Sequence, residues 1–211
     1  MRHSTYLRRL LAAASTFALL AGSAAATPLS FSGTLASDDA HFVFNFHLDK
    51  TSTMHARTTS WAQGGFAPVL TLFGGAGGVQ QAAGSAMICG AGSGAADGAT
   101  GFCWDAVLNS DLGAGDYTLV LTQDGNMANG DTLDAGFQLD GWTNYTSQFY
   151  LGLEGGPLCT NVDASQRSCG WSLSVDGIAE QPSGDVPEPG TLALAGLGLL
   201  ALRRVRRDRR T

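Results

Sequence analysis

Side chains that carry oxygen ligands gather in two turns of this chain. Asp38 and Asp39 are adjacent between two apolar segments, and Asp124, Asn126 and Asp131 lie within one short polar loop. Carboxylate and amide oxygens crowded into turns are the ligands that calcium prefers, although this loop does not match the EF-hand pattern. These five residues are therefore the candidate calcium ligands. The alternative is that they only form turns by hydrogen bonding to their own backbone.

Residue types used in catalysis are present, but their spacing does not group them. His41 and His47 fall on one face of an expected strand, about 20 Å apart at roughly 3.3 Å per residue, too far to share a metal through that strand. The segment 90–94, Gly-Ala-Gly-Ser-Gly, departs from the G-x-S-x-G pattern of a hydrolase nucleophile. No lysine or arginine lies between Arg57 and Arg167, which disfavours a phosphate-binding loop. We expect no catalytic residues and no cofactor other than calcium, and a secreted hydrolase is the least favoured alternative.

Aromatic residues concentrate in the C-terminal third of the body. Flat rings on the face of a β-sandwich can stack on sugar rings, so they are candidates for carbohydrate binding. Core packing is the alternative that explains most aromatic residues in such folds. The five residues are Trp142, Tyr145, Phe149, Tyr150 and Trp171.

Short strands must position these side chains. Phe42, Phe44, Phe46 and Leu48 alternate with mostly polar residues, the period of two that is typical of a strand with one buried face. Clusters of glycine mark turns between strands, and no amphipathic helix is evident in the body. The sequence therefore predicts an all-β fold, an antiparallel β-sandwich or jelly roll. Further strands are expected at residues 29–35, 53–60, 69–73, 102–108, 117–122, 148–153 and 171–178.

The N-terminus has the parts of a secretory signal peptide. Three arginines precede an apolar run at residues 10–20, and Ala24-Ala25-Ala26 offers a cleavage site before Thr27. We expect a signal helix here and export by the Sec machinery. The pair Arg8-Arg9 leaves twin-arginine export as an alternative.

All four cysteines lie in the part of the chain that would be exported, where oxidation is expected. Four cysteines allow three pairings. The local pairing, Cys89 with Cys103 and Cys159 with Cys169, closes two short loops. A zinc site is the alternative, although the spacings do not resemble paired C-x-x-C motifs.

The C-terminus joins three unlike segments. Val186-Pro187-Glu188-Pro189-Gly190 keeps the backbone extended because each proline fixes its φ angle. An apolar stretch at 191–202 and an arginine cluster at 203–210 follow, and the arginines would stay on the cytoplasmic side of a membrane. The stretch is shorter than the roughly 20 residues of a stable spanning helix. A short C-terminal transmembrane helix with snorkelling arginines suits a transient anchor better than a permanent one.

This order of segments resembles the PEP-CTERM sorting tail, which an exosortase, a membrane-embedded cysteine transpeptidase-like protease, recognises in bacteria. The resemblance covers residues 186–210. It implies that Val186, Pro187, Glu188 and Pro189 form the sorting motif, with cleavage at or next to the Pro-Glu-Pro step. Some family names call this tail an ice-binding protein C-terminal domain, a label that does not imply ice binding. A plain single-pass anchor is the alternative.

The body carries motifs of its own. Phe31-Ser32-Gly33-Thr34-Leu35, Gly64-Gly65-Phe66-Ala67-Pro68 and Trp104-Asp105-Ala106 are examples from a similarity that runs over most of residues 31–178. They resemble exported PEP-CTERM proteins with a GFDP motif, whose body is a β-sandwich similar to the bacterial pre-peptidase C-terminal domain. Ala67 stands where that family usually has Asp, so any role of that carboxylate in a turn or cation site is missing here.

Removing both ends changes the charge of the protein. Residues 27–185 hold three basic and 16 acidic residues, a net charge of −13, whereas the whole chain has −6. Such a surface argues against nucleic acid and anionic lipid as partners, and it favours solubility or divalent cations.

These patterns predict four parts: a signal peptide at 1–26, a β-sandwich domain at 27–180, a linker at 181–185 and a sorting tail at 186–211. The predicted protein is exported and non-enzymatic. It would pass through a transient inner-membrane intermediate to the cell surface or the extracellular space, in association with exopolysaccharide or biofilm. The alternative function is a carbohydrate- or calcium-binding module at the cell surface.

Overall fold

The computed structural model describes residues 28–75, 78–90 and 93–178. The chain divides into two compact units, Met1–Ala179 and Glu180–Thr211, and the described residues all belong to the first unit. The predicted signal helix, linker, sorting motif and C-terminal transmembrane helix lie outside the described residues. Within the described part, no helix combines the length and the apolar character that crossing a membrane requires.

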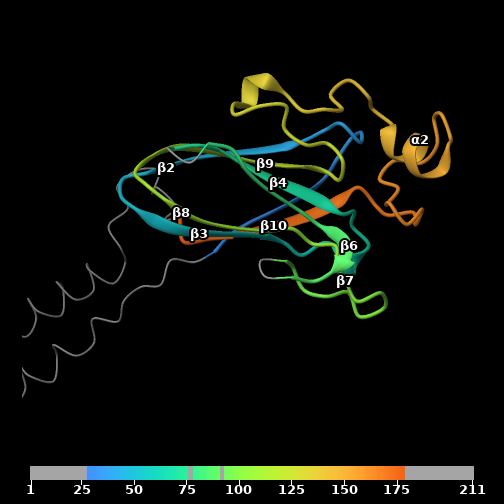
Figure 1. Cartoon of the computed structure of the whole chain (residues 1–211), viewed down its shortest axis with the longest axis horizontal. Helices are drawn as coiled ribbons and strands as arrows, with labels where there is room; N and C mark the ends of the chain where they lie inside the picture. The colour runs from blue at the N-terminus through green and yellow to red at the C-terminus, as the bar shows by residue number, and fades with distance from the viewer. Residues whose placement is uncertain (1–27, 76–77, 91–92, 179–211) are drawn as a thin grey trace, which may run out of the picture. The chain divides into compact units, whose positions relative to one another are not determined.

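Two four-stranded antiparallel sheets face each other, which confirms the predicted β-sandwich (Figure 1). The first sheet has the order β1-β10-β3-β8 and the second has the order β2-β9-β4-β5. A two-stranded sheet of β6 and β7 lies beside them. The strands are β1 Leu29–Thr34, β2 Phe42–Leu48, β3 Ser52–Thr58, β4 Pro68–Gly74, β5 Gln80–Ala83, β6 Ser85–Ile88, β7 Phe102–Cys103, β8 Val107–Leu112, β9 Gly115–Gln123 and β10 Gly170–Asp176.

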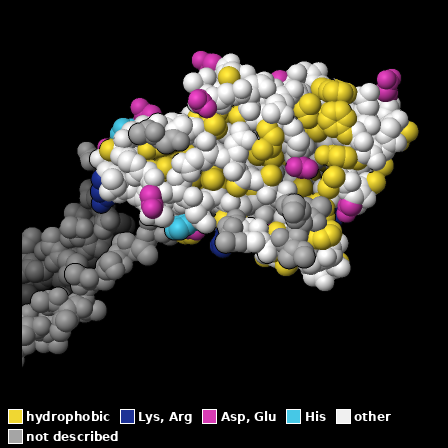
Figure 2. Space-filling model, viewed as in Figure 1, with side chains coloured by type: hydrophobic (Ala, Val, Ile, Leu, Met, Phe, Trp, Pro, Cys, Tyr) yellow, Lys and Arg dark blue, Asp and Glu magenta, His cyan; other side chains and the backbone are white. Residues whose placement is uncertain are grey.

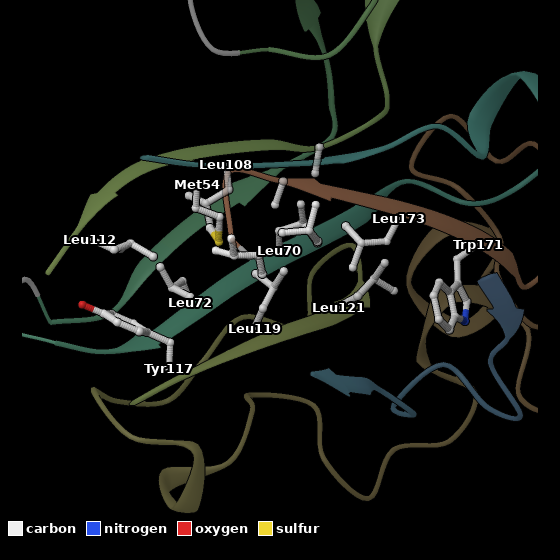
Figure 3. Packing of buried hydrophobic residues seen from close by; sticks show 14 of the residues in the cluster. Met54, Leu70, Leu72, Leu108, Leu112, Tyr117, Leu119, Leu121, Trp171 and Leu173 are labelled. Carbon is white, nitrogen blue, oxygen red and sulfur yellow. The ribbon is translucent and has the colours of Figure 1, made fainter. Parts of the chain in front are cut away.

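The core lies between the inner faces of the two sheets. In β3 the side chains of Met54 and Ala56 are buried while their neighbours are exposed, as a period of two requires. Leu70 of β4 and Leu119 of β9 meet them from the second sheet (Figure 3). The first and last strands are partners, with Leu29 opposite Val175 at one end of the pair. The apolar face of β2 also packs inward, as predicted, and its Phe42 ring lies 4.5 Å from the Trp171 ring.

A loop covers the outer face of the second sheet. Phe137 of this loop packs against Phe73 of β4 and Val120 of β9, and the Phe73 and Phe137 rings meet edge to face at 6.2 Å. As a result β4 is buried on both faces, with a near-continuous apolar run. The loop contains the short 3-10 helix η2, Leu133–Ala135. A similar 3-10 helix, η1 Trp61–Gln63, follows β3.

Two sequence predictions about the elements are wrong. The expected strand at 148–153 is largely helix, α2 Tyr145–Leu151, in a body where the sequence showed no evident amphipathic helix. The helix ends at Gly152, which adopts the left-handed conformation with φ of 67° that glycine accepts without strain. The expected strand at 102–108 is broken into β7 and β8, because buried Trp104 turns away to stack on Trp61 at 4.6 Å.

Both disulfides follow the local pairing. Cys89 bonds to Cys103 over a sequence separation of 14, and Cys159 bonds to Cys169 over a separation of 10. Cys103 and Cys159 are buried. The first bridge closes the glycine-rich loop beside β6 and β7, and the second ties the segment after α2 to the start of β10.

Candidate functional site

Asp38 connects the turn between β1 and β2 to α2. Its side chain is fully buried, and its Oδ2 accepts hydrogen bonds from the backbone N–H of Thr146 at 2.9 Å and from the Oγ1–H of Thr146 at 2.6 Å. Its Oδ1 accepts from the backbone N–H of Cys159 at 2.7 Å. Asn144, at the N-cap position of α2, makes no capping hydrogen bond with its side chain. Asp38 therefore supplies from a distance the acceptor that the first helical turn needs.

Asp39, the next residue, holds the loop that precedes α2. Its Oδ2 accepts from the backbone N–H of Gly141 at 3.1 Å, and the backbone N–H of Asp38 donates to the carbonyl of Thr143 at 3.0 Å. Hydrogen bonds with Asp38 and Asp39 therefore hold the backbone on both sides of Trp142. Both carboxylates act as acceptors for internal hydrogen bonds.

Trp142 and Phe149 form an exposed aromatic pair on the surface that Asp38 and Asp39 fix in place. The exposed fractions of their side chains are 41% and 50%, and their rings meet edge to face with centroids 4.9 Å apart. Hydrophobic side chains gather near the end of the sandwich that carries α2 (Figures 1 and 2). Exposed neighbouring aromatic rings are typical of interaction sites, because solvation of such surface is unfavourable.

The other three predicted aromatic candidates are more enclosed. Tyr145 is fully buried and donates its hydroxyl hydrogen to the carbonyl of Asp124 at 2.8 Å, and Trp171 is buried in the core. Tyr150 is partly buried, and burial together with the neighbouring Asp124 raises its pKa to about 12. The sequence identified the aromatic cluster, but only Trp142 and Phe149 present large exposed rings.

The three calcium candidates of the loop after β9 have different surroundings. Asn126 is fully buried, and its Oδ1 accepts from the backbone N–H of Leu139 at 2.8 Å. Asp124 is partly buried, and this burial raises its pKa above the ordinary value, whereas Asp131 is exposed. Within residues 28–75, 78–90 and 93–178, no three His, Cys, Asp or Glu side chains form a group that could hold a metal ion.

The three histidines of the body are exposed and lie in separate surroundings. His47 pairs with Asp116 at 2.7 Å and with Asp49 at 3.5 Å, and the hydrogen bond to Asp116 is the main cause of its raised pKa. The His55 ring hydrogen-bonds to Asn109, and the His41 ring lies 5.5 Å from that of Phe137. The structure therefore does not bring these side chains together into one site.

Sequence reasoning missed one organised cluster, in which Arg167 stacks on Trp61. The guanidinium carbon lies 3.5 Å from the centre of the Trp61 ring, and the guanidinium donates hydrogen bonds to the carbonyls of Gly65 and Trp61. Partial burial lowers the pKa of Arg167. Ala67, at the position where the resembling family has Asp, is buried beside Trp61 and Trp104. This cluster joins the segment before β10 to the turn after β3 and has a structural role.

Comparison with known proteins identifies the C-terminal tail. A family model described as the PEP-CTERM protein-sorting motif matches residues 185–210. The chain therefore carries the sorting motif that the sequence predicted, and this motif indicates an exported protein that an exosortase sorts and processes after a transient membrane-anchored state. A search of curated proteins finds no match to the chain.

Proposed function

We propose that this chain is a non-enzymatic protein of the cell surface or extracellular matrix whose body associates with exopolysaccharide. The observation that carries the proposal is the exposed pair of Trp142 and Phe149. The flat faces of aromatic rings pack against the C–H groups of pyranose rings, and both partners lose apolar surface to water. Export through the Sec machinery is part of the proposal and is supported by the arrangement of charges and apolar residues at the N-terminus.

The rigidity of the pair favours recognition of a ligand. Buried Asp38 caps α2, which carries Phe149, and the hydrogen bonds of Asp38 and Asp39 fasten the chain on both sides of Trp142. A backbone held in one conformation around the rings loses little conformational entropy on binding, so more of the stacking energy contributes to affinity.

The charge of the body limits which polysaccharide it can bind. Residues 27–185 carry a net charge of −13, and acidic side chains are scattered over the face seen in Figure 2. A polyanionic polymer would be repelled, more strongly at low ionic strength. The proposed ligand is therefore a neutral glycan.

Affinity measurements on polysaccharide test the proposal. The exported body is mixed with exopolysaccharide of the producing bacterium and with insoluble cellulose and chitin, and bound protein is measured by sedimentation. We expect Trp142→Ala and Phe149→Ala each to weaken binding about tenfold. Val162→Ala removes another exposed apolar side chain, with 46% of its surface accessible, and should bind as the wild type does.

Two results would overturn the proposal. One is wild-type affinity in both aromatic variants. The other is absence of binding to every polysaccharide together with a concentration-dependent dimer that Trp142→Ala dissociates, which would assign the aromatic pair to contact with a second copy of the chain. Size-exclusion chromatography with light scattering measures the dimer.

A further inference from the structure

A groove lies over the outer face of β3 and β8, on a part of the body that Trp142 and Phe149 do not line. Its volume is ≈ 630 Å³, within the range of about 300–1,000 Å³ that is typical of small-molecule sites. Outward-facing residues of the two strands form its floor. Ser93, Gly94 and Ala95, from the loop that the Cys89–Cys103 disulfide closes, line it as well.

The floor of the groove is an ordered grid of side chains. Strand pairing fixes each residue opposite its partner, and neighbouring strands are about 4.8 Å apart. Polar groups of one row are therefore spaced on the scale of a single sugar ring. One row across β10, β3 and β8 is Asp176, His55 and Asn109, and the next row contributes Arg57 and Val107 to the groove.

The floor holds both hydrogen-bond donors and hydrogen-bond acceptors. The Nδ1–H of His55 donates to the Oδ1 of Asn109 at 2.9 Å, which leaves the Nδ2–H groups of Asn109 as donors. Arg57 is exposed and forms no ion pair with any described residue, and its guanidinium carries five N–H donors. Asp176 adds a carboxylate acceptor at the end of the first row.

The charges of the groove disfavour an anionic ligand. Of the described residues that line it, Arg57 and His55 are the basic ones, whereas Asp105 and Asp176 are acidic. Asp105 turns its Oδ1 toward Thr58 and the backbone after β3, where it accepts three hydrogen bonds. A phosphate or a uronate would meet the two carboxylates and the negative field of the body. Neutral hydroxyl groups, which both donate and accept, match a floor that holds donors and acceptors together.

We infer that this groove is a second saccharide site, which binds one or two residues of a neutral glycan through hydrogen bonds. The inference rests on the proposed function for the class of ligand, but it concerns a different surface. Thr59 also lines a smaller groove over β1 and β10, so a polymer can continue across the sheet from one groove to the other. Two sites on one body make the protein bivalent, and linked sites raise the effective concentration of the second contact.

Binding of short neutral oligosaccharides isolates the groove from the aromatic pair. The probes are cellohexaose, xylohexaose and maltohexaose, with oligogalacturonate as the anionic control, measured by calorimetry and by shifts of side-chain amide signals in NMR spectra. We expect Asn109→Ala and Arg57→Met each to weaken binding about tenfold in the Trp142→Ala background. Asn45→Ala is the matched control, because Asn45 also forms an exposed cross-strand hydrogen bond, with Thr118 at 2.7 Å, on the other sheet.

The outcomes separate the second site from the proposed function. Oligosaccharide binding that survives Trp142→Ala, fails in Asn109→Ala and shifts the Asn109 amide signals supports the groove. Binding that is unchanged in Asn109→Ala and Arg57→Met, with both variants folded by circular dichroism, overturns the second site even if Trp142→Ala abolishes polymer binding. Tighter binding of oligogalacturonate than of the neutral probes would also overturn it.

Discussion

The carboxylate of Asp38 accepts two hydrogen bonds from Thr146, although 108 residues separate them along the chain. A third hydrogen bond, from the backbone N–H of Cys159, joins the same carboxylate to the second disulfide. One buried side chain therefore holds together the β1–β2 turn, the start of α2 and the segment after the helix. The orientation of the aromatic pair depends on it.

Asp38→Asn should destabilise the protein by about 3 kcal/mol. The substitution keeps one oxygen but replaces the other by an amide that cannot accept, so one of the buried donors loses a hydrogen bond to a charged partner. Urea denaturation measures the free energy of unfolding. Asp131→Asn, which changes an exposed side chain, is the control, and equal stability of the two variants would show that the Asp38 contacts contribute little.

Arg167→Lys should destabilise the body nearly as much as Arg167→Ala, by about 2–3 kcal/mol. Lysine keeps the charge, but it cannot stack a planar guanidinium on Trp61 and reach the carbonyls of Gly65 and Trp61 together. Thermal and urea unfolding measure the loss, with Lys50→Ala as the control for removal of an exposed positive charge. Stability of Arg167→Lys equal to that of the wild type would assign the interaction to charge alone.

Asp124→Asn should stabilise the protein at pH 7 and less so at pH 3. Burial raises the pKa of Asp124 in the folded state above 3.8, so the folded state binds the proton more tightly than the unfolded state does. The contribution of Asp124 to the free energy of unfolding is therefore present at low pH, and it is lost as the pH rises through the raised pKa. Urea unfolding at both pH values, with Asp131→Asn for comparison, measures the difference. If Asp124→Asn raised the free energy of unfolding by the same amount at pH 3 and pH 7, the raised pKa of Asp124 would be contradicted.

Removal of the second disulfide should cost more stability than removal of the first. Each disulfide closes a short loop and contributes about 2–3 kcal/mol to the free energy of unfolding, because it restricts the unfolded chain. Replacing Cys159 and Cys169 by alanine also disturbs the fully buried Cys159, whose backbone N–H donates to Asp38. Paired Cys→Ala variants of each bridge, compared by urea unfolding, test this order. A larger loss from the Cys89–Cys103 pair would contradict it.

Replacing Pro187, Glu188 and Pro189 by alanine should prevent processing of the tail. These residues lie within the matched sorting motif. Mass spectrometry of the exported wild type should show a C-terminus at or next to them, whereas the variant should retain its sequence to Thr211 in the membrane fraction. Gln181→Ala, outside the motif, should be processed normally. A wild-type protein that ends at Thr211 in strains with and without the exosortase would refute processing.

Sequence alone predicted the strands whose partners impose a period of two. Phe42, Phe44 and Phe46 of β2 alternate because only one face of this edge strand meets the core. Helix α2 escaped prediction because its first turn is completed by Asp38, a contact that no local pattern reveals. The break between β7 and β8 near Trp104 also depends on a contact between distant parts of the sequence, because Trp104 stacks on Trp61.

The sequence predicted that aromatic residues form the candidate site, but it did not predict which of them are exposed. The sequence placed five aromatic residues in one region, but burial in the fold decides that Trp142 and Phe149 are exposed while Tyr145 and Trp171 are not. The groove over β3 and β8 could not be predicted, because the register of Asp176, His55 and Asn109 depends on pairing between strands far apart in the chain.

The pairing of β1 with β10 places the first and last described residues at the same end of the body. Leu29 lies opposite Val175 at one end of this pair, and Thr34 lies opposite Gly170 at the other, about 17 Å away at roughly 3.4 Å per residue. Both ends of the described chain leave from the Leu29 end, and the backbone N–H of Leu35 bonds to Cys169 on the side of α2. The described chain therefore begins and ends at the end of the sandwich opposite to α2 and the aromatic pair.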